Sequence, residues 1–387
     1  MPGPDRTLLK GSTPDGRTVL SVVTGARFEV DFYGRCHRRD GEFALQTEFA
    51  YYDDIVYPGR YKPSLLKRDI DLWAWRDFTD LVIQGVARSD RPVPSLDVNL
   101  VVRGSGANLS RTLRATGDRR LVVRGGEMFL SDAVPFTEMP VRYDKAYGGT
   151  DELAESRLAN PEELALLREL AGDEDEELSE YSYPRNPAGK GFAIDPDSLD
   201  GLAWPNLEWS DDALDTARLI APVKKWGHRP YPACFDWFQH GWFPRVAFFG
   251  EFPDTFDDLI PDPERSLGIL PENLGSINLF ERPKSGFAQG AHPFLARQRF
   301  AGDEQLRVTA MSSDGRDFQL ALPAVRPEVI IRTPDTGDTA AHVSLDLVFL
   351  NTETGMLDLV WRATLLSPRQ HLPPRWEEQH PYRIVWR

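Results

Sequence analysis

The sequence predicts a mainly β fold, and three observations support this prediction. Short runs of β-branched and aromatic residues recur at close spacing along most of the chain. Turn-forming pairs such as Asp40-Gly41 and Asp314-Gly315 separate several of these runs. The 387 residues are 41% hydrophobic and 27% charged, which is the balance of an ordinary globular protein. We therefore expect two β-sandwich- or barrel-like lobes, joined through a central glycine-rich segment and carrying a short helical acidic insert.

Residues 1–150 are expected to form the N-terminal β lobe. Apolar β-rich runs predict strands at residues 79–85 and 96–102. Residues 111–124 predict a hairpin that turns at Gly117-Asp118. Every second position from 43 to 49 is Phe, Leu or Thr, which is the pattern of a half-buried strand.

Residues 151–183 form the predicted acidic insert. Asn160 can cap a helix, Pro161 suits its first position, and three leucines spaced by three give it an apolar stripe. Between residues 150 and 182 there are 12 acidic residues and two arginines, so this stretch carries −10 of the net charge of −15. The insert is either a solvated loop or an electrostatic docking element for a basic partner, and both interpretations stay open.

Residues 184–387 are expected to form the C-terminal β-rich lobe. Hairpins are predicted over residues 305–322, around Asp314-Gly315, and over residues 342–365, around Thr354-Gly355. The densest aromatic region spans residues 230–256 and could be either core or an exposed binding face. If it is a binding face, the candidate partner contacts are Trp237, Phe238, Trp242 and Phe243.

The central segment runs from Pro135 to Glu208 and holds two glycine-rich motifs. Gly148-Gly149 permits backbone angles that other residues rarely adopt, which indicates irregular backbone of a specified shape. The segment is either a structural crossing between the lobes or a shaped binding surface. Its candidate site residues are Tyr143, Tyr147, Gly148, Gly149, Asn186, Pro187, Gly189, Gly191, Pro205, Asn206 and Glu208.

Three strings of residues in this segment, in this order, resemble the domain-of-unknown-function family numbered 2169. They are Pro135-Phe-Thr-Glu-Met-Pro-Val-Arg-Tyr-Asp-Lys-Ala-Tyr-Gly-Gly-Thr150, Asn186-Pro-Ala-Gly-Lys-Gly-Phe192 and Pro205-Asn-Leu-Glu208. The resemblance implies a bacterial adaptor or chaperone of the cytosol, encoded beside type VI secretion genes, that helps to load a toxin onto the secretion spike. It brings no catalytic residues with it.

The residues themselves give no signature of catalysis, and we expect no cofactor. The segment around Gly189-Lys190 departs from a phosphate-binding loop at both ends, and the seven histidines include no His-Glu-x-x-His pair. The two cysteines lack the spacing of metal ligands. The net charge disfavours a nucleic-acid partner, and no apolar stretch approaches the ~18 residues that span a membrane. A cytoplasmic protein is therefore expected.

Two hypotheses for function follow. The first is a non-enzymatic adaptor or chaperone whose partners are a type VI secretion toxin effector and the spike protein. The alternative is a carbohydrate-binding or carbohydrate-active β protein that uses surface aromatic side chains and paired carboxylates.

Overall fold

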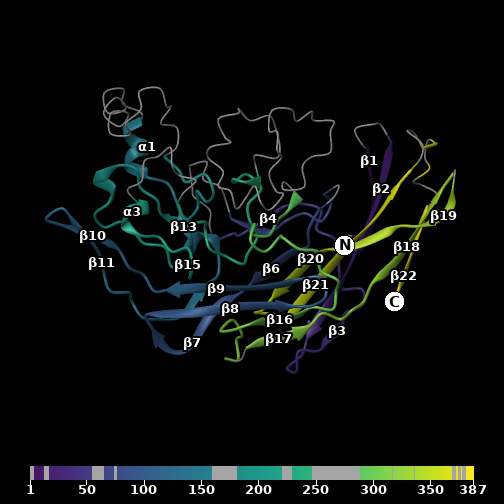
Figure 1. Ribbon diagram of the computed structural model, residues 1–387, viewed down its shortest axis with the longest axis horizontal. Coiled ribbons are helices and arrows are strands. Elements are labelled where there is room, and N and C mark those ends of the chain that lie inside the picture. The colour runs from purple at the N-terminus through teal and green to yellow at the C-terminus, as the bar shows by residue number, and fades with distance from the viewer. Residues whose placement is uncertain are drawn as a thin grey trace.

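The structure is a computed structural model whose strands dominate its elements (Figure 1). It describes residues 4–12, 17–54, 65–73, 76–158, 181–219, 229–245, 288–315, 317–334, 336–367, 372–373, 376 and 381–387. The mainly β prediction is confirmed. Among the described helices, none has both the length and the apolar character to cross a membrane.

The largest sheet has six strands, with the order β1-β2-β21-β20-β6 and β3 paired to β2. All its neighbours are antiparallel except β20 and β6, which run parallel. The strands β2, β21, β20 and β6 are buried over most of their length, as expected where both faces of a sheet are covered. The strands are β1 (Arg6–Ser12), β2 (Thr18–Val30), β3 (Cys36–Arg38), β6 (Asp80–Gln84), β20 (His342–Asn351) and β21 (Met356–Leu366).

The second large sheet has five antiparallel strands in the order β15-β9-β8-β16-β17. In β8 the side chains alternate between buried and more exposed positions, so one face of this sheet covers the core. Its strands are β8 (Ser95–Arg103), β9 (Asn108–Thr116), β15 (Leu207–Trp209), β16 (Gln305–Val308) and β17 (Phe318–Ala321). Both large sheets therefore combine strands from residues 1–150 with strands from residues 184–387.

Smaller sheets surround these two. In Figure 1 the hairpin of β10 and β11 lies at one end of the molecule, and β18, β19 and β22 lie at the other. The strands are β4 (Ala50–Tyr51), β5 (Leu66–Arg68), β7 (Val86–Val93), β10 (Leu121–Arg124), β11 (Glu127–Leu130), β12 (Phe136–Pro140), β13 (Tyr147–Gly148), β14 (Lys190–Gly191), β18 (Pro327–Thr333), β19 (Gly337–Ala340) and β22 (Tyr382–Trp386). Within the described ranges the helices are α1 (Glu152–Leu158), α3 (Thr216–Leu219) and two 3₁₀ turns, η1 (Tyr143–Lys145) and η2 (Pro196–Ser198).

Several predicted elements are confirmed. The strands at residues 79–85 and 96–102 correspond to β6 and β8. The hairpins at residues 305–322 and 342–365 correspond to β16 with β17 and β20 with β21. The helix predicted from residue 160 lies outside the described residues.

Two predicted elements are wrong. Residues 43–49 form no strand, although Phe43 and Leu45 are buried in the core. Residues 111–124 form no hairpin, because β9 pairs with β8 and β15 while β10 pairs with β11. The chain leaves the sheet at Gly117, whose N–H donates to the carbonyl of Pro94 at 3.0 Å.

Candidate functional site

The two glycine-rich motifs join each other through a short parallel ladder between β13 and β14. The side-chain amide of Asn186 donates hydrogen bonds to the carbonyl oxygens of Tyr143 (2.8 Å) and Tyr147 (3.0 Å). A Cβ on Gly148 would lie 2.1 Å from the carbonyl oxygen of Asn186, so this close approach requires glycine. The motifs thus hold each other in place.

The rest of the central segment is tied to the five-stranded sheet. The Asn206 amide donates to the carbonyl of Thr116 at 2.9 Å and to Asp118 at 3.1 Å. The Glu208 carboxylate accepts hydrogen bonds from Arg119 at 2.6 Å and from the N–H of Leu214 at 3.0 Å. Among the candidate residues of this segment only Pro187 and Gly189 are half-buried, and the others are buried: Tyr143, Tyr147, Gly148, Gly149, Asn186, Gly191, Pro205, Asn206 and Glu208. Their burial supports a structural crossing rather than a binding surface.

The aromatic cluster is part of the core. Trp237, Phe238 and Trp242 are each at most 2% exposed. The rings of Phe238 and Trp242 meet that of Tyr143 edge to face, with centroids 5.4 and 5.5 Å apart. Of the two interpretations left open, core packing is the one that the structure shows, and we withdraw these three residues as partner contacts. Phe243 is half-buried and stays a prediction.

The core also holds several carboxylates paired with arginines. Examples are Asp80 with Arg76 at 2.9 Å and Asp346 with Arg362 at 2.7 Å. Since these side chains are buried, no substrate reaches them in this conformation, and their pairing marks them as structural. They are not the accessible carboxylate pair that a carbohydrate-active enzyme needs.

Asp236 is a buried carboxylate with neutral partners. It accepts hydrogen bonds from the Tyr52 hydroxyl at 2.7 Å and the Gln84 amide at 2.8 Å. Burial raises its pKa to about 7, because desolvation disfavours the charged form more than these hydrogen bonds stabilise it. This group makes part of the core sensitive to pH.

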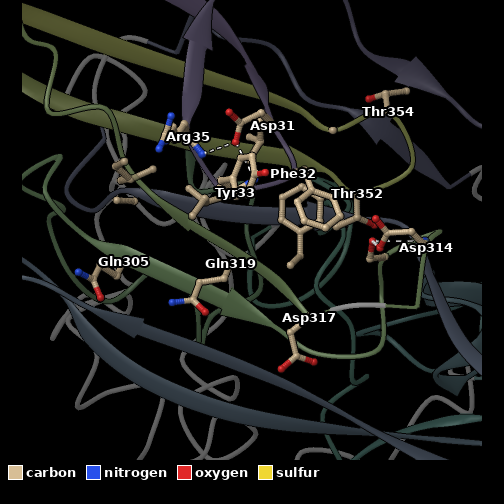
Figure 2. Close-up of a pocket in the computed structure, with 18 of the residues that line it drawn as sticks. Asp31, Phe32, Tyr33, Arg35, Gln305, Asp314, Asp317, Gln319, Thr352 and Thr354 are labelled. Atoms are coloured by element: carbon tan, nitrogen blue, oxygen red, sulfur yellow. Dashed lines mark hydrogen bonds between the residues drawn. The ribbon is translucent and has the colours of Figure 1, made fainter.

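The described residues also form a surface groove. It has a volume of about 970 Å³ and lies between the β2–β3 turn, the strand β17 and the β20–β21 turn. Figure 2 shows residues of these elements around it. Among the described residues its lining has four acidic side chains and one arginine: Asp31, Asp314, Asp317, Glu353 and Arg35.

Two neighbouring aromatic side chains of the β2–β3 turn stand at this groove. Phe32 is 66% exposed and Tyr33 is 78% exposed, and their rings meet edge to face with centroids 5.3 Å apart. The guanidinium of Arg35 lies 5.6 Å from the centre of the Tyr33 ring. Large exposed aromatics beside a groove mark an interaction site more often than a single exposed apolar residue does.

Asp31 shapes the turn that carries this pair. Its carboxylate accepts hydrogen bonds from the N–H groups of Tyr33 (2.8 Å) and Arg35 (2.9 Å). Its other oxygen contacts His37 Nε2 at 2.8 Å. The hydrogen bond with His37, followed by that from the Arg35 N–H, lowers the pKa of Asp31. The turn is therefore preorganised, which reduces the entropy lost when a partner binds.

This groove is absent from the sites that the sequence predicted. A signal was present, because Asp31 and Gly34 bracket the two aromatic residues as turn formers do, which places the rings at a hairpin tip. The opposite wall could not have been found in the same way, since β17 lies almost 300 residues further along the chain.

No grouping of three or more His, Cys, Asp or Glu side chains suited to a metal ion occurs within the described parts of the chain. Cys234 is buried, and burial raises the pKa of its thiol well above the usual value, so it is held as a neutral thiol.

Comparison with known proteins places the chain in one sequence family. Residues 15–362 match the family described as "Uncharacterized protein conserved in bacteria (DUF2169)". No curated protein and no solved structure matches the chain. Because the match covers most of the sequence, the chain belongs to the DUF2169 family.

Proposed function

We propose that this protein is a non-enzymatic adaptor or chaperone that binds a toxin effector and helps to load it onto the type VI secretion spike. The proposal places it in the bacterial cytoplasm. The observation that carries the binding role is the exposed pair of Phe32 and Tyr33, held by a rigid turn over an open groove. The secretion context rests on the resemblance described above.

The groove favours a partner with an apolar and a basic side chain. Aromatic side chains are frequent anchors of protein interfaces, since they bury a large area with little loss of conformational entropy. Of the groove carboxylates, Glu353 is paired with Arg88 and Asp317 with Arg307, so attraction of a basic side chain would rest on Asp31 and Asp314.

The alternative is carbohydrate binding. Exposed aromatic rings beside amide and carboxylate side chains, as with Tyr33, Gln319 and Asp31, can also stack on and hydrogen-bond to a sugar. The two functions differ in the ligand that the same groove retains.

The test is co-expression of the tagged chain with the toxins and spike proteins encoded near its gene. The proposal predicts a stable complex that increases the soluble yield of the toxin. Combined replacement of Phe32 and Tyr33 by Ala should abolish that complex, whereas Tyr51→Ala, at an exposed aromatic outside the groove lining, should leave it intact. If no neighbour co-purifies and the groove instead retains a polysaccharide, the adaptor proposal fails.

A further inference from the structure

The hairpin formed by β10 and β11 presents two strand edges with different surroundings. The chain turns at Gly125-Gly126, and Arg124 faces Glu127 across the closing pair. Figure 1 shows this hairpin at one end of the molecule. The groove with Phe32 and Tyr33 shares no lining residue with it.

The edge of β10 is already occupied. The N–H of Leu121 donates to the carbonyl of Leu202, and the carbonyl of Leu121 accepts from the N–H of Gly201, both at 2.9 Å. The N–H of Val123 donates to the Asp200 carboxylate at 3.0 Å. This edge therefore has no room for another strand.

The edge of β11 differs. In an antiparallel ladder, every second residue of a strand exchanges hydrogen bonds with the neighbouring strand. The N–H of Ser131 donates to the carbonyl of Arg120, so Phe129, two residues earlier, is bonded to Val122 of β10. The N–H and C=O groups of Met128 and Leu130 consequently point away from β10. No hydrogen bond from elsewhere in the described ranges reaches these four groups. An edge with unpaired backbone groups is a template for a further strand.

Beyond Glu127, the first residue of β11, the same edge is apolar. Phe129 is 50% exposed, Leu130 is 38% exposed, and Val134 just beyond the strand is 61% exposed. All three belong to the small set of large hydrophobic side chains that are exposed among the described residues. Natural proteins usually protect such an edge with charge or proline, so its apolar character indicates a binding role.

A pocket of about 330 Å³ adjoins the C-terminal end of β11. Leu130 and Ala133 form part of its wall, together with Trp204, Trp209 and Leu214. The one acidic side chain in the lining, Glu208, is paired with Arg119 at 2.6 Å. The pocket is large enough for one apolar side chain, and it needs no counter-charge from a ligand.

These features select the occupant. A second copy of the chain is disfavoured, because a four-residue edge provides far less than the roughly 1,200 Å² of a stable interface. Each copy also carries a net charge of −15, which opposes self-association. A short extended segment of another polypeptide matches the length of this edge, and its binding as an added strand relies on backbone hydrogen bonds and one pocket instead of a large buried area.

We propose that β11 binds an extended segment of a partner polypeptide as an added strand, with an apolar side chain of that segment in the pocket beside Leu130. Backbone hydrogen bonds to Met128 and Leu130 would supply the affinity and the pocket the specificity. The inference builds on the proposed function by giving an adaptor a second surface, separate from the groove. It remains testable if that function is wrong.

The probe is a phage-displayed library of random 12-residue peptides, panned on the full chain. We expect enriched peptides with apolar residues at alternate positions. Binding should weaken by about tenfold in Met128→Pro, which removes an outward N–H at a position outside the pocket lining, and much less in Met128→Ala, which keeps that N–H. The melting temperature of each variant shows whether the hairpin still folds.

Two further readouts do not depend on variants. Hydrogen exchange at the amides of Met128 and Leu130 should slow when a selected peptide binds, while the inward amide of Phe129 stays protected throughout. Methylation of alternate backbone nitrogens of the peptide should abolish binding. The proposal is overturned if no peptide is enriched, if these two amides gain no protection, or if the methylated peptides bind unchanged.

The co-expression experiment separates this inference from the proposed function. If the Phe32 and Tyr33 double variant loses the toxin complex but still binds the selected peptides at β11, the result supports both the proposed function and the added strand. A toxin complex that forms while the library yields nothing at β11 refutes the added strand alone.

Discussion

Gly34 lies against the carbonyl oxygen of Gln319, so close that a Cβ at position 34 would stand 2.0 Å from that oxygen. This contact joins the turn that carries the exposed aromatic pair to the edge strand β17 of the other large sheet. It is reinforced by Cys36, whose thiol donates to the carbonyl of Ala321 at 3.3 Å. The groove therefore has two walls that are fixed to each other.

Gly34→Ala should destabilise the protein and displace the aromatic turn. Gly34 has a φ of +76°, and the added methyl group would also collide with backbone. Gly41 has the same φ, and a Cβ there would meet no atom within 4 Å, so Gly41→Ala is a matched control. We expect the control to lose about 1 kcal/mol of unfolding free energy and Gly34→Ala to lose about 2 kcal/mol more. Equal losses in urea denaturation would show that the contact does not constrain the turn.

Trp242→Ala should lower the free energy of unfolding by about 3–5 kcal/mol, because it empties a buried aromatic site. Tyr33→Ala, at an exposed ring, should change it by less than about 0.5 kcal/mol. Thermal and urea denaturation of both variants check this. Near-native stability of Trp242→Ala would make Trp242 a candidate surface residue again.

Asn186→Ala should lower the free energy of unfolding by about 2–3 kcal/mol, since it leaves the buried carbonyl of Tyr147 without the Asn186 donor and leaves the carbonyl of Tyr143 with the Ala146 N–H alone. Asn108 is an exposed asparagine whose amide donates to a single backbone carbonyl, that of Gly104, so Asn108→Ala is the control. Its loss should stay below about 1 kcal/mol. Similar losses for the two variants would mean that the central motifs do not lock each other.

The stability of the protein should depend on the protonation of Asp236. Its pKa is about 7 when folded and 3.8 for the unperturbed side chain. At a pH between 3.8 and about 7, Asp236 is deprotonated in the unfolded chain and protonated in the folded chain. The contribution of this group to the free energy of unfolding therefore falls as the pH rises. The expected slope is up to about −1.4 kcal/mol per pH unit, and it levels off above the folded pKa.

Asp236→Asn isolates this contribution, because the amide does not titrate. We expect its unfolding free energy, measured by urea denaturation, to gain on that of the wild type as the pH rises from 4 to 7. Parallel pH profiles would show that Asp236 is ionised in the folded protein.

Local patterns predicted local structure well. The hairpin of β20 and β21 turns at a Thr354-Gly355 pair, and Gly355 has the positive φ (+68°) that such a turn requires. The alternation at residues 43–49 misled, because the ring of Phe43 is buried against Gly25 of β2 from a segment that has no strand partner there. Alternation reports burial on one side, and it does not report a hydrogen-bonded neighbour.

Long-range structure could not be predicted from such patterns. The pairing of β6 with β20 joins residues more than 260 positions apart, and nothing in either strand specifies the other. For the same reason the sequence left open whether Trp237 lies in the core or on a face. The sequence indicated that Asn186 and Gly148 have specified conformations, and the structure adds that they specify each other.

The most direct test of the adaptor proposal is the affinity of the purified chain for the toxin that co-purifies with it, measured by calorimetry. We predict that combined replacement of Phe32 and Tyr33 by Ala weakens binding by about 30-fold or more, as expected for loss of an aromatic anchor, while the melting temperature is unchanged. Tyr51→Ala should bind as the wild type does. Unchanged affinity of the double variant would contradict the account, because the groove would then not be the site that holds the partner.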